Sequence, residues 1–432
     1  MNITFIETRS PRYGRTLKGI IQRRGAKEER VEGSVQGIIQ AVRRHGDLAL
    51  TRYARLFDGV RLRRTEIEVK PRELDEAMKL ISKDNLRALR FAARRITRFH
   101  RHQLEKSWRY RDPLGLVLGQ NMNPLERVGV YVPGGKACYP SSVLMNVIPA
   151  KVAGVKEVVM TSPLGVSPVP ILAAARISQV DRVFRVGGAQ AIAAMAYGTE
   201  TIPTVDKIVG PGNIYVATAK RLVFGQVGID SIAGPSEILL LIDSSADPTY
   251  VAADMLSQAE HDEMATALCV TPSRSMGLKV KAALEKQLKE TKRRAIITKA
   301  LERFGAIIIT RGLKEGVDLV NAIAPEHVEV IVQNPRRWAG SIRNAGAIFV
   351  GPYTPPPLGD YVAGPNHVLP TGGRARFFSP LGTYDFIKRT SFIQDNKRGL
   401  TSLAPWIVKL AHLEGLDEHA RAVTSRIKKS VE

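Results

Sequence analysis

Near its middle the chain contains the stretch Arg182-Val-Phe-Arg-Val-Gly-Gly-Ala-Gln-Ala-Ile-Ala-Ala-Met-Ala-Tyr197. Residues 182–186 form a β-branched run that ends at two glycines, which is typical of a buried strand. The alanine-rich run 189–197 that follows is typical of a helix packed against a sheet. A strand followed at once by a helix indicates an α/β fold built on parallel strands.

The same alternation extends from about residue 127 to residue 350. Short apolar runs bounded by Gly or Pro predict strands at Val128–Val132, Glu157–Thr161, Arg182–Val186, Lys207–Val209, Glu237–Ile242, Leu268–Thr271, Ala306–Thr310, Val328–Val332 and Ala347–Val350. Helices are expected between them at Ile171–Ile177, Ala189–Tyr197, Tyr215–Phe224 and Tyr250–Gln258. Residues 1–112 are helical in pattern almost throughout, and the chain becomes irregular after residue 373 and helical again from about Leu403.

Composition excludes several classes of protein. A length of 432 residues allows about three domains of ~150 residues each. No apolar run approaches the ~18 residues of a membrane-spanning helix, and charged residues appear by Glu7, so neither a membrane span nor a signal peptide is expected. With only Cys138 and Cys269, a disulfide framework is excluded and a reducing, cytoplasmic setting is expected.

The net charge of +23 raises the question of a nucleic-acid partner. Residues 1–112 carry a net charge of +14 and residues 373–432 carry +5, whereas the 260 residues between them carry only +4. The densest basic stretch, 87–101, has the apolar spacing of an amphipathic helix, so it is either a polyanion-binding helix or a solvated face. The solvated face is favoured because no known nucleic-acid module surrounds the stretch, and nucleic-acid binding is not expected.

Glycine-rich turns follow several of the predicted strands, where α/β folds place their ligands. These turns are Pro133-Gly-Gly135, Gly187-Gly188, Gly210-Pro-Gly212 and Gly234-Pro235. None of them matches the G-x-G-x-x-G dinucleotide fingerprint or a phosphate-binding P-loop, and no H-E-x-x-H is present.

Four histidines, His45, His100, His102 and His412, are expected at the surface. Gln258 and His261 lie three residues apart at a predicted helix end, so an amide oxygen and an imidazole could face one metal ion. This pair alone is more typical of a hydrogen-bonded helix terminus.

Glu326 and His327 open a predicted strand directly after Pro325. A carboxylate and an imidazole at a sheet edge could activate water and act as a general base, or could serve only as a cap or an edge-strand pair. Asp360 follows a Pro/Gly-rich run, as a metal ligand supplied by a loop would, whereas Glu414 and His419, five residues apart on a terminal helix, are on local grounds solvated surface residues. Gln258, His261, Asp360 and His419 would form a ligand set without thiolate that suits zinc, with manganese or cobalt in exchange.

Seven strings occur in an order that resembles the histidinol dehydrogenase family from about residue 30 to the C-terminus. They are Arg127-Val-Gly-Val-Tyr-Val-Pro-Gly-Gly135, Val186-Gly-Gly-Ala-Gln-Ala191, Lys207-Ile-Val-Gly-Pro-Gly-Asn213, Ala233-Gly-Pro-Ser-Glu237, Gln258-Ala-Glu-His-Asp262, Ala324-Pro-Glu-His327 and Gly359-Asp-Tyr-Val-Ala-Gly-Pro-Asn-His367.

The resemblance implies an activity and a set of site residues. The family oxidises L-histidinol to L-histidine, in the last steps of histidine biosynthesis, through an aldehyde and two hydride transfers to NAD. Matched residue by residue, His327 corresponds to the general base and Glu326 to the residue that activates water. The matched zinc ligands are Gln258, His261, Asp360 and His419; the matched substrate contacts also include Ser236, His327 and Glu414, with His367 a further candidate; and the matched NAD contacts are Tyr131, Gln190 and Asn213.

The resemblance also implies an architecture of two Rossmann-like parallel-sheet domains with helical arms, in an intertwined homodimer with shared active sites. We expect an N-terminal arm at 1–30, a first α/β domain at 31–130 plus 236–378 with the metal and substrate site, a second at 131–235 with the NAD contacts, and a C-terminal arm at 379–432 that completes the partner's site.

Two other classes of function compete with an NAD-dependent oxidoreductase. A metal-dependent hydrolase could use Glu326 and His327 without NAD. A basic nucleic-acid-binding protein could retain a degenerate enzyme core, although the motif residues are intact in this sequence.

Overall fold

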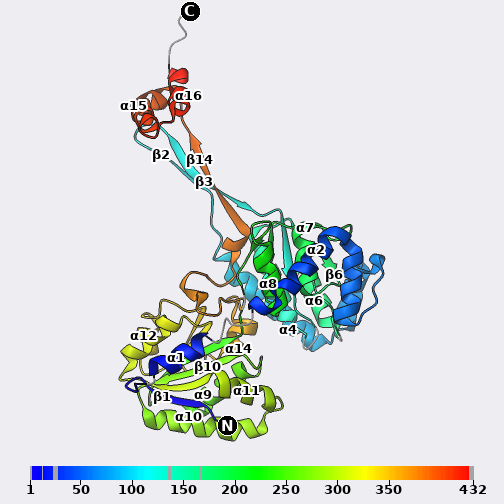
Figure 1. The fold of residues 1–432 in the computed structure, drawn as a ribbon, viewed down its shortest axis with the longest axis vertical. Coiled ribbons are helices and arrows are strands. Elements are labelled where there is room, and N and C mark those ends of the chain that lie inside the picture. Colours follow the sequence, from blue (N-terminus) through cyan, green and yellow to red (C-terminus); the bar gives the residue numbers. More distant parts are fainter. Residues whose placement is uncertain are drawn as a thin grey trace, which may run out of the picture. The chain divides into compact units, whose positions relative to one another are not determined.

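The computed structural model describes residues 2–11, 13–22, 28–134, 138–165, 167–232 and 234–427. Gly135 and Ala233, which belong to two of the quoted strings, lie outside the described residues. The chain divides into two compact units, one made of Met1–Gln103 and Leu125–Phe386 and the other of Leu104–Pro124 and Ile387–Glu432 (Figure 1). None of the described helices combines the length and the apolar content needed to cross a membrane.

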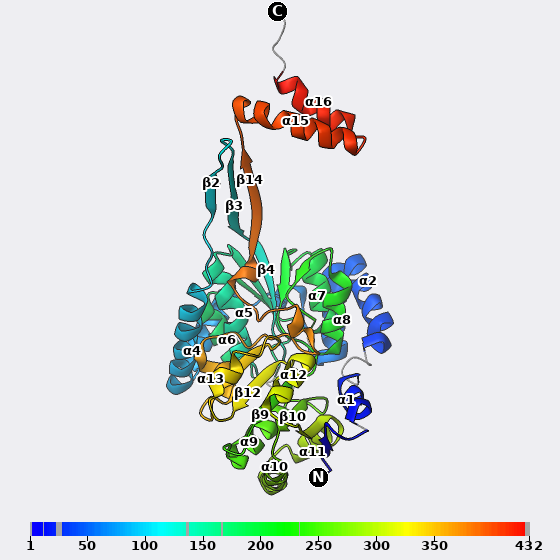
Figure 2. The ribbon, with the colours of Figure 1, turned by 90° about the vertical axis from the view of Figure 1, so that its left-hand side faces the viewer.

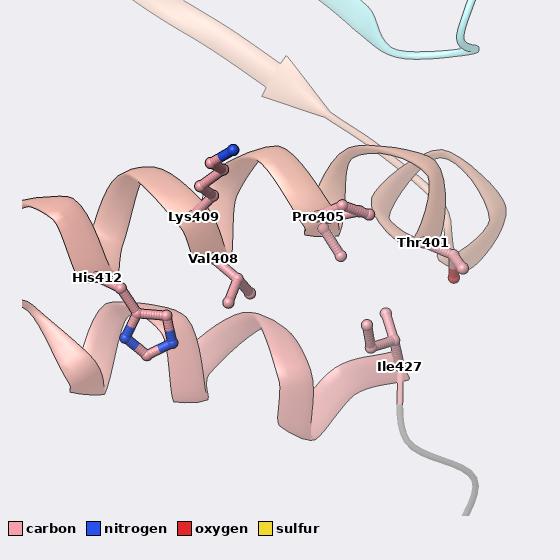
Figure 3. Close-up of a pocket in the computed structure, with 7 residues that line it drawn as sticks. Thr401, Pro405, Val408, Lys409, His412 and Ile427 are labelled. Atoms are coloured by element: carbon pink, nitrogen blue, oxygen red, sulfur yellow. The ribbon is translucent and has the colours of Figure 1, made fainter.

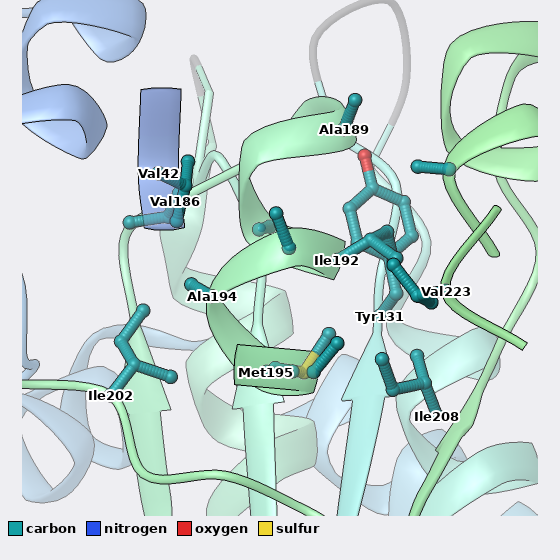
Figure 4. Packing of buried hydrophobic residues seen from close by; sticks show 14 of the residues in the cluster. Val42, Tyr131, Val186, Ala189, Ile192, Ala194, Met195, Ile202, Ile208 and Val223 are labelled. Atoms are coloured by element: carbon teal, nitrogen blue, oxygen red, sulfur yellow. The ribbon is translucent and has the colours of Figure 1, made fainter. Parts of the chain in front are cut away.

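The first unit contains a five-stranded parallel sheet in the order β6-β5-β4-β7-β8. Its strands are β4 (Arg127–Tyr131), β5 (Glu157–Thr161), β6 (Arg182–Phe184), β7 (Lys207–Val209) and β8 (Gly228–Ile229). On one face the apolar side chains of the sheet pack against helices α2 (Glu28–Tyr53), α7 (Gly188–Tyr197) and α8 (Ile214–Val223) (Figure 4). On the other side lie α5 (Pro140–Ala153) and α6 (Pro168–Ser178), with α3 (Pro71–Leu80) and α4 (Lys83–Arg101) packed against them.

A six-stranded parallel sheet in the same unit has the order β1-β11-β10-β9-β12-β13. Its strands are β1 (Thr4–Glu7), β9 (Glu237–Ile242), β10 (Thr266–Thr271), β11 (Gly305–Ile309), β12 (His327–Ile331) and β13 (Ala347–Val350). One face packs against α9 (Pro248–Ala259), α10 (Arg274–Gln287) and α11 (Arg294–Phe304). The other face packs against α1 (Tyr13–Gln22), α12 (Leu313–Ile323) and α13 (Pro335–Ala339).

Local sequence explains these elements. All six residues of β9 are buried, and the five that follow Glu237 are apolar, as expected for a parallel strand covered by helices on both faces. Helix α9 begins where Asp247 accepts a hydrogen bond from the main-chain N–H of Thr249, with Pro248 in the first helical position.

The second unit consists of a three-stranded antiparallel sheet and two helices (Figure 2). Strand β3 (Val117–Pro124) lies between β2 (Trp108–Arg111) and β14 (Ile387–Gln394). Helices α15 (Lys397–Leu413) and α16 (Asp417–Ile427) pack against each other.

All nine predicted strands and the four predicted helices are present, with ends that differ by at most a few residues. The helical assignment of residues 1–112 is wrong at β1 and β2, and the irregular segment after residue 373 contains β14. These strands lack a buried apolar run, since every residue of β2 is exposed and β14 is mostly exposed. The expectation that His100 lies at the surface is wrong, because α4 turns its side chain into the interior, where Nδ1 lies 2.9 Å from the carbonyl oxygen of Ile96.

One buried ion pair fixes the loop after β7. The Lys220 ammonium of α8 contacts the Asp230 carboxylate and donates a hydrogen bond to the carbonyl oxygen of Gly210 at 2.9 Å. Asp230 also accepts the main-chain N–H of Gly210 at 2.8 Å, and both charged side chains are at most 5% exposed. The pair therefore holds the Gly210 turn against the end of β8.

We expect Asp230→Ala to lower the free energy of unfolding by about 3–5 kcal/mol, because it leaves the Lys220 charge buried without a partner. Urea unfolding measures the loss. The matched control is Asp75→Ala, which removes the exposed partner of Arg176 and should cost at most about 1 kcal/mol. Equal losses in the two variants would contradict the assignment.

Candidate active site

Glu326 and His327 are held at the start of β12 by the main chain of a neighbouring strand. The Glu326 carboxylate accepts a hydrogen bond from the N–H of Glu237 at 2.8 Å. The Nδ1 atom of His327 lies 3.0 Å from the carbonyl oxygen of the same Glu237 and donates to it when it carries the proton. Both side chains are less than 10% exposed, so the first residue of β9 fixes the orientation of both groups.

Strand β12 lies between β9 and β13, so the edge-strand interpretation of the pair is wrong. The edge that carries Glu326 and His327 is the amino edge of the sheet, where its parallel strands begin. The expectation that ligands gather at the carboxyl ends of strands therefore does not describe this cluster. Gly234-Pro235 likewise precedes β9 instead of following a strand of its sheet.

Asp360 faces His327 from η4 (Gly359–Ala363), a single π-helical turn of the kind that often occurs at functional sites. Its Oδ1 lies 3.6 Å from Nε2 of His327. The Nδ1 atom of His367 lies 2.9 Å from the main-chain oxygen of Asp360 and tethers the turn. Although burial raises the pKa of Asp360, contact with His327 and the nearby charges of His327, His367 and His261 outweigh it, and the pKa is lowered.

The basic helix α4 contributes to this arrangement. Arg95 donates hydrogen bonds to the carbonyl oxygens of Val362 and Ala363, at the end of η4. One arginine of the basic stretch is therefore neither simply solvated nor available to a polyanion, because it anchors the turn that carries Asp360.

Two carboxylates govern the charge state of His327. Burial lowers the pKa of His327, but the Glu326 and Asp360 carboxylates together outweigh burial, and the pKa lies well above the usual histidine value. Burial is the largest influence on His367 and lowers its pKa. Of these two histidines, His327 is the one poised to carry a proton.

Gln258 and His261 lie on and just after the last turn of α9, at the same edge of the sheet. Gln258 is buried and His261 is exposed, and the charge of His261 reaches Asp360. Ser236 directly precedes β9, and its carbonyl oxygen accepts the N–H of Thr266 at 2.9 Å. Among the described residues, no three His, Cys, Asp or Glu side chains are grouped closely enough to hold a metal ion.

Glu414 and His419 belong to the second unit, whereas His327 belongs to the first. They are not on one helix, because Glu414 caps the end of α15 and His419 lies in α16. A hollow of about 540 Å³ lies between these two helices and is lined by residues such as Val408, His412 and Ile427 (Figure 3). Neither Glu414 nor His419 is among its lining residues.

Tyr131, Gln190 and Asn213 lie at the carboxyl edge of the five-stranded sheet, where the strand order reverses between β4 and β7. The Tyr131 hydroxyl accepts the main-chain N–H of Gly188 at 3.1 Å, beside the first turn of α7 (Figure 4). Asn213 caps α8 by accepting the N–H groups of Tyr215 and Val216. The side-chain amide of Gln190 is buried and has no hydrogen-bond partner among the described residues.

Gly210 permits the close approach of β4 and β7 at this point. Its φ of +115° lies in the region that favours glycine, and a Cβ atom there would lie 2.1 Å from the carbonyl oxygen of Tyr131. No side chain can therefore be added without displacing the strand that carries Tyr131.

Sequence reasoning missed one pair of residues beside the site. Glu329 follows His327 by two residues in β12 and faces Asp254 of α9, so two carboxyl groups meet inside an otherwise apolar layer. The sequence does mark this position, because Glu329 is the one charged residue inside the apolar run Val328-Glu-Val-Ile-Val332.

Comparison with known proteins gives consistent matches. The family model described as histidinol dehydrogenase matches residues 21–427. A histidinol dehydrogenase of Syntrophotalea carbinolica is 53% identical over 420 residues, which cover 97% of each chain. One of Aquifex aeolicus is 53% identical over 413 residues, 95% of this chain and 96% of that relative. The crystal structure of histidinol dehydrogenase from Elizabethkingia anophelis has a TM-score of 0.92 at 34% identity and covers 98% of each chain.

We expect Glu326→Gln to lower the pKa of His327, because one of the two carboxylates that raise it is removed while an oxygen remains to accept the N–H of Glu237. Titration of the histidine side chains by NMR in metal-free protein measures the midpoint. Glu302→Gln, at an exposed carboxylate that accepts the N–H of Asn2, is the control and should leave the midpoint unchanged. An unshifted midpoint in Glu326→Gln would show that Glu326 does not govern the charge of His327.

Proposed function

The chain belongs to the histidinol dehydrogenase family of oxidoreductases, and from this premise we propose that it oxidises L-histidinol to L-histidine through L-histidinal with two molecules of NAD. The observation that carries the proposal is the placement of Glu326 and His327 on the main chain of Glu237, opposite Asp360. Bound NAD would supply the hydride acceptor, and a zinc ion held by Gln258, His261 and Asp360 would supply a Lewis acid that orients the substrate.

His327 is the proposed general base. With the proton on Nδ1 donated to the carbonyl oxygen of Glu237, Nε2 carries the lone pair that can accept a proton from the hydroxyl of histidinol. Among the described residues this Nε2 atom is buried without a hydrogen-bond partner, as expected for an atom that forms its hydrogen bond with the substrate. A cation held by Asp360 would cancel part of the charge that raises the pKa of His327 and so favour the neutral base.

Glu326 is the proposed activator of water. Its Oε2 atom is held by the N–H of Glu237, which leaves Oε1 to take a proton from the water that adds to the aldehyde. Removing that proton in place allows the second oxidation to end in the carboxylate of histidine.

The residues at the amino edge fit a zinc ion in part. Gln258, His261 and Asp360 supply amide, imidazole and carboxylate donors without a thiolate, a set that suits zinc or manganese. His419, the fourth proposed ligand, and Glu414, a proposed substrate contact, lie in the second unit. We propose that both are contributed by the partner of a homodimer with shared active sites, and that Ser236 and His367 also contact the substrate.

The carboxyl edge of the five-stranded sheet fits the anionic cofactor. Helices α7 and α8 begin at this edge, so the positive ends of their helix dipoles favour phosphate groups there. The buried amide of Gln190 has no hydrogen-bond partner among the residues that the structure describes, which leaves its donors and acceptor for a ligand at that edge. We therefore propose that residues within 131–235 contact NAD and that residues within 236–378 bind the metal and the substrate. The expected grouping of 31–130 with 236–378 conflicts with the packing of α2, α3 and α4 around the five-stranded sheet.

We expect the wild-type chain to form two NADH per L-histidinol, and His327→Ala to lower kcat by roughly 10²–10⁴ because the proton acceptor is lost. NADH absorbance measures turnover. His45→Ala, at an exposed histidine of α2, is the control and should keep kcat within about twofold. Turnover like that of the wild type in His327→Ala would refute the assigned base.

Removal of the metal should abolish turnover. A chelator followed by desalting should give protein that still unfolds cooperatively but forms no NADH, and zinc or manganese should restore activity because the donors are nitrogen and oxygen atoms. Metal content measured on the same samples gives the stoichiometry. Full turnover by metal-free protein would refute a metal-dependent site.

A further inference from the structure

A carboxyl side chain lies in the apolar layer beneath the proposed site. Glu329 is paired in register with Leu240 of β9 and Phe349 of β13 and shares its face of β12 with His327 and Ile331. That face packs against α9, and Glu329 is only 2% exposed. Burial of a charged carboxylate in such a layer is costly unless it finds a partner.

The partner is a second carboxyl group. Among the described residues no hydrogen-bond donor reaches either carboxylate oxygen of Glu329, and the side chain that faces it is the carboxyl group of Asp254 in α9. Two ionised carboxylates in contact repel each other, so the contact is favourable when the two groups share one proton. Burial raises the pKa of both groups, and the Asp254 charge raises that of Glu329 further, which agrees with one shared proton.

The position of the pair matches the geometry of the site. Glu329 follows His327 by two strand residues, or about 6.6 Å along β12. Asp254 precedes Gln258 by four helical residues, or about 6 Å along α9. Glu329 is therefore about as far from His327 along β12 as Asp254 is from Gln258 along α9. A contact between the two carboxyl groups would fix the position of Gln258 relative to His327.

We propose that Asp254 and Glu329 form a hydrogen-bonded carboxyl pair that fastens α9 to β12 and so positions Gln258 and His261 against His327. The inference rests on the function proposed above for those three residues. Apolar packing alone lets a helix slide along a sheet at little cost, whereas a directional hydrogen bond fixes its register. Stability does not explain the pair, because apolar residues of similar volume in place of buried ionisable groups are often neutral or stabilising.

The test compares Glu329→Leu with Glu329→Gln in the zinc-loaded, full-length protein. Leucine fits the apolar layer but breaks the hydrogen bond, so we expect an unfolding midpoint near that of the wild type, a fall of about 10–100-fold in zinc affinity and a rise in KM for histidinol. Glutamine can donate its amide hydrogen to Asp254, so Glu329→Gln should restore zinc affinity and KM to within about threefold. Zinc affinity is measured by competition with a fluorescent chelator, which does not depend on turnover.

Ile331→Val is the matched control, since it alters the same face of β12 one pleat further from the site. It should lower the unfolding midpoint and leave zinc affinity unchanged. If Glu329→Leu does not fold, the double variant Asp254→Leu with Glu329→Leu removes both polar groups and takes its place in the comparison.

The outcomes separate this inference from the proposed function. Wild-type zinc affinity and KM in a folded leucine variant would overturn the positioning role, and so would an equal loss in the glutamine variant. A wild-type chain that forms no NADH from histidinol would refute the proposed function instead, while zinc affinity would still report on the pair.

Discussion

The parallel pairing of β9 with β12 is the constraint on which the candidate site depends. These strands are about 90 residues apart in the chain, yet their pairing places His327 opposite Ile238. It also brings the main-chain N–H of Glu237 to the Glu326 carboxylate and the main-chain carbonyl of Glu237 to the His327 ring. The main-chain N–H and C=O groups of Glu237 thus orient a carboxylate and an imidazole. These groups cannot rotate while the strand is paired, whereas polar groups on a side chain could. Without this pairing, the His327 ring that Asp360 contacts would not be held in place, and neither would its position relative to Gln258 and His261 at the end of α9.

The two sheets of the first unit expose opposite edges to the proposed ligands, and helix dipoles explain why this suits the chemistry. Helices α9 and α12 end at the amino edge of the six-stranded sheet, so their negative ends favour cations such as a metal ion or a protonated amine. Helices α7 and α8 begin at the carboxyl edge of the five-stranded sheet, so their positive ends favour phosphate groups. Each edge thus has the electrostatics that its proposed ligand requires.

Sequence patterns predicted the parts of the fold in which local and tertiary demands agree. Strands such as β9 are buried on both faces, so their apolar runs are visible without knowledge of their partners. Strands β2 and β14 are mostly exposed and mix charged residues with aromatic and aliphatic ones, so no buried apolar run marks them, and they form strands by pairing with β3. In the site, Glu326, His327 and Asp360 stood out by residue type, but the role of Glu237 lies in its main chain and cannot be predicted before β9 and β12 are paired.

The net charge of the chain is positive, whereas the carboxylates next to His327 are negative. Both can hold because the effect of an exposed charge falls off with its distance from the site. Histidinol carries a protonated amine, so a chain of +23 would repel it if all charges acted equally. Salt screens exposed charges beyond about 8 Å at physiological ionic strength, whereas buried groups are screened far less. Glu326 and Asp360 lie within 4 Å of the His327 ring nitrogens. The proposed carboxyl pair of Asp254 and Glu329 would add one further negative charge beneath them. The field that a cationic substrate meets at His327 is therefore set by these carboxylates, and the arginines of α4 contribute mainly where Arg95 holds η4.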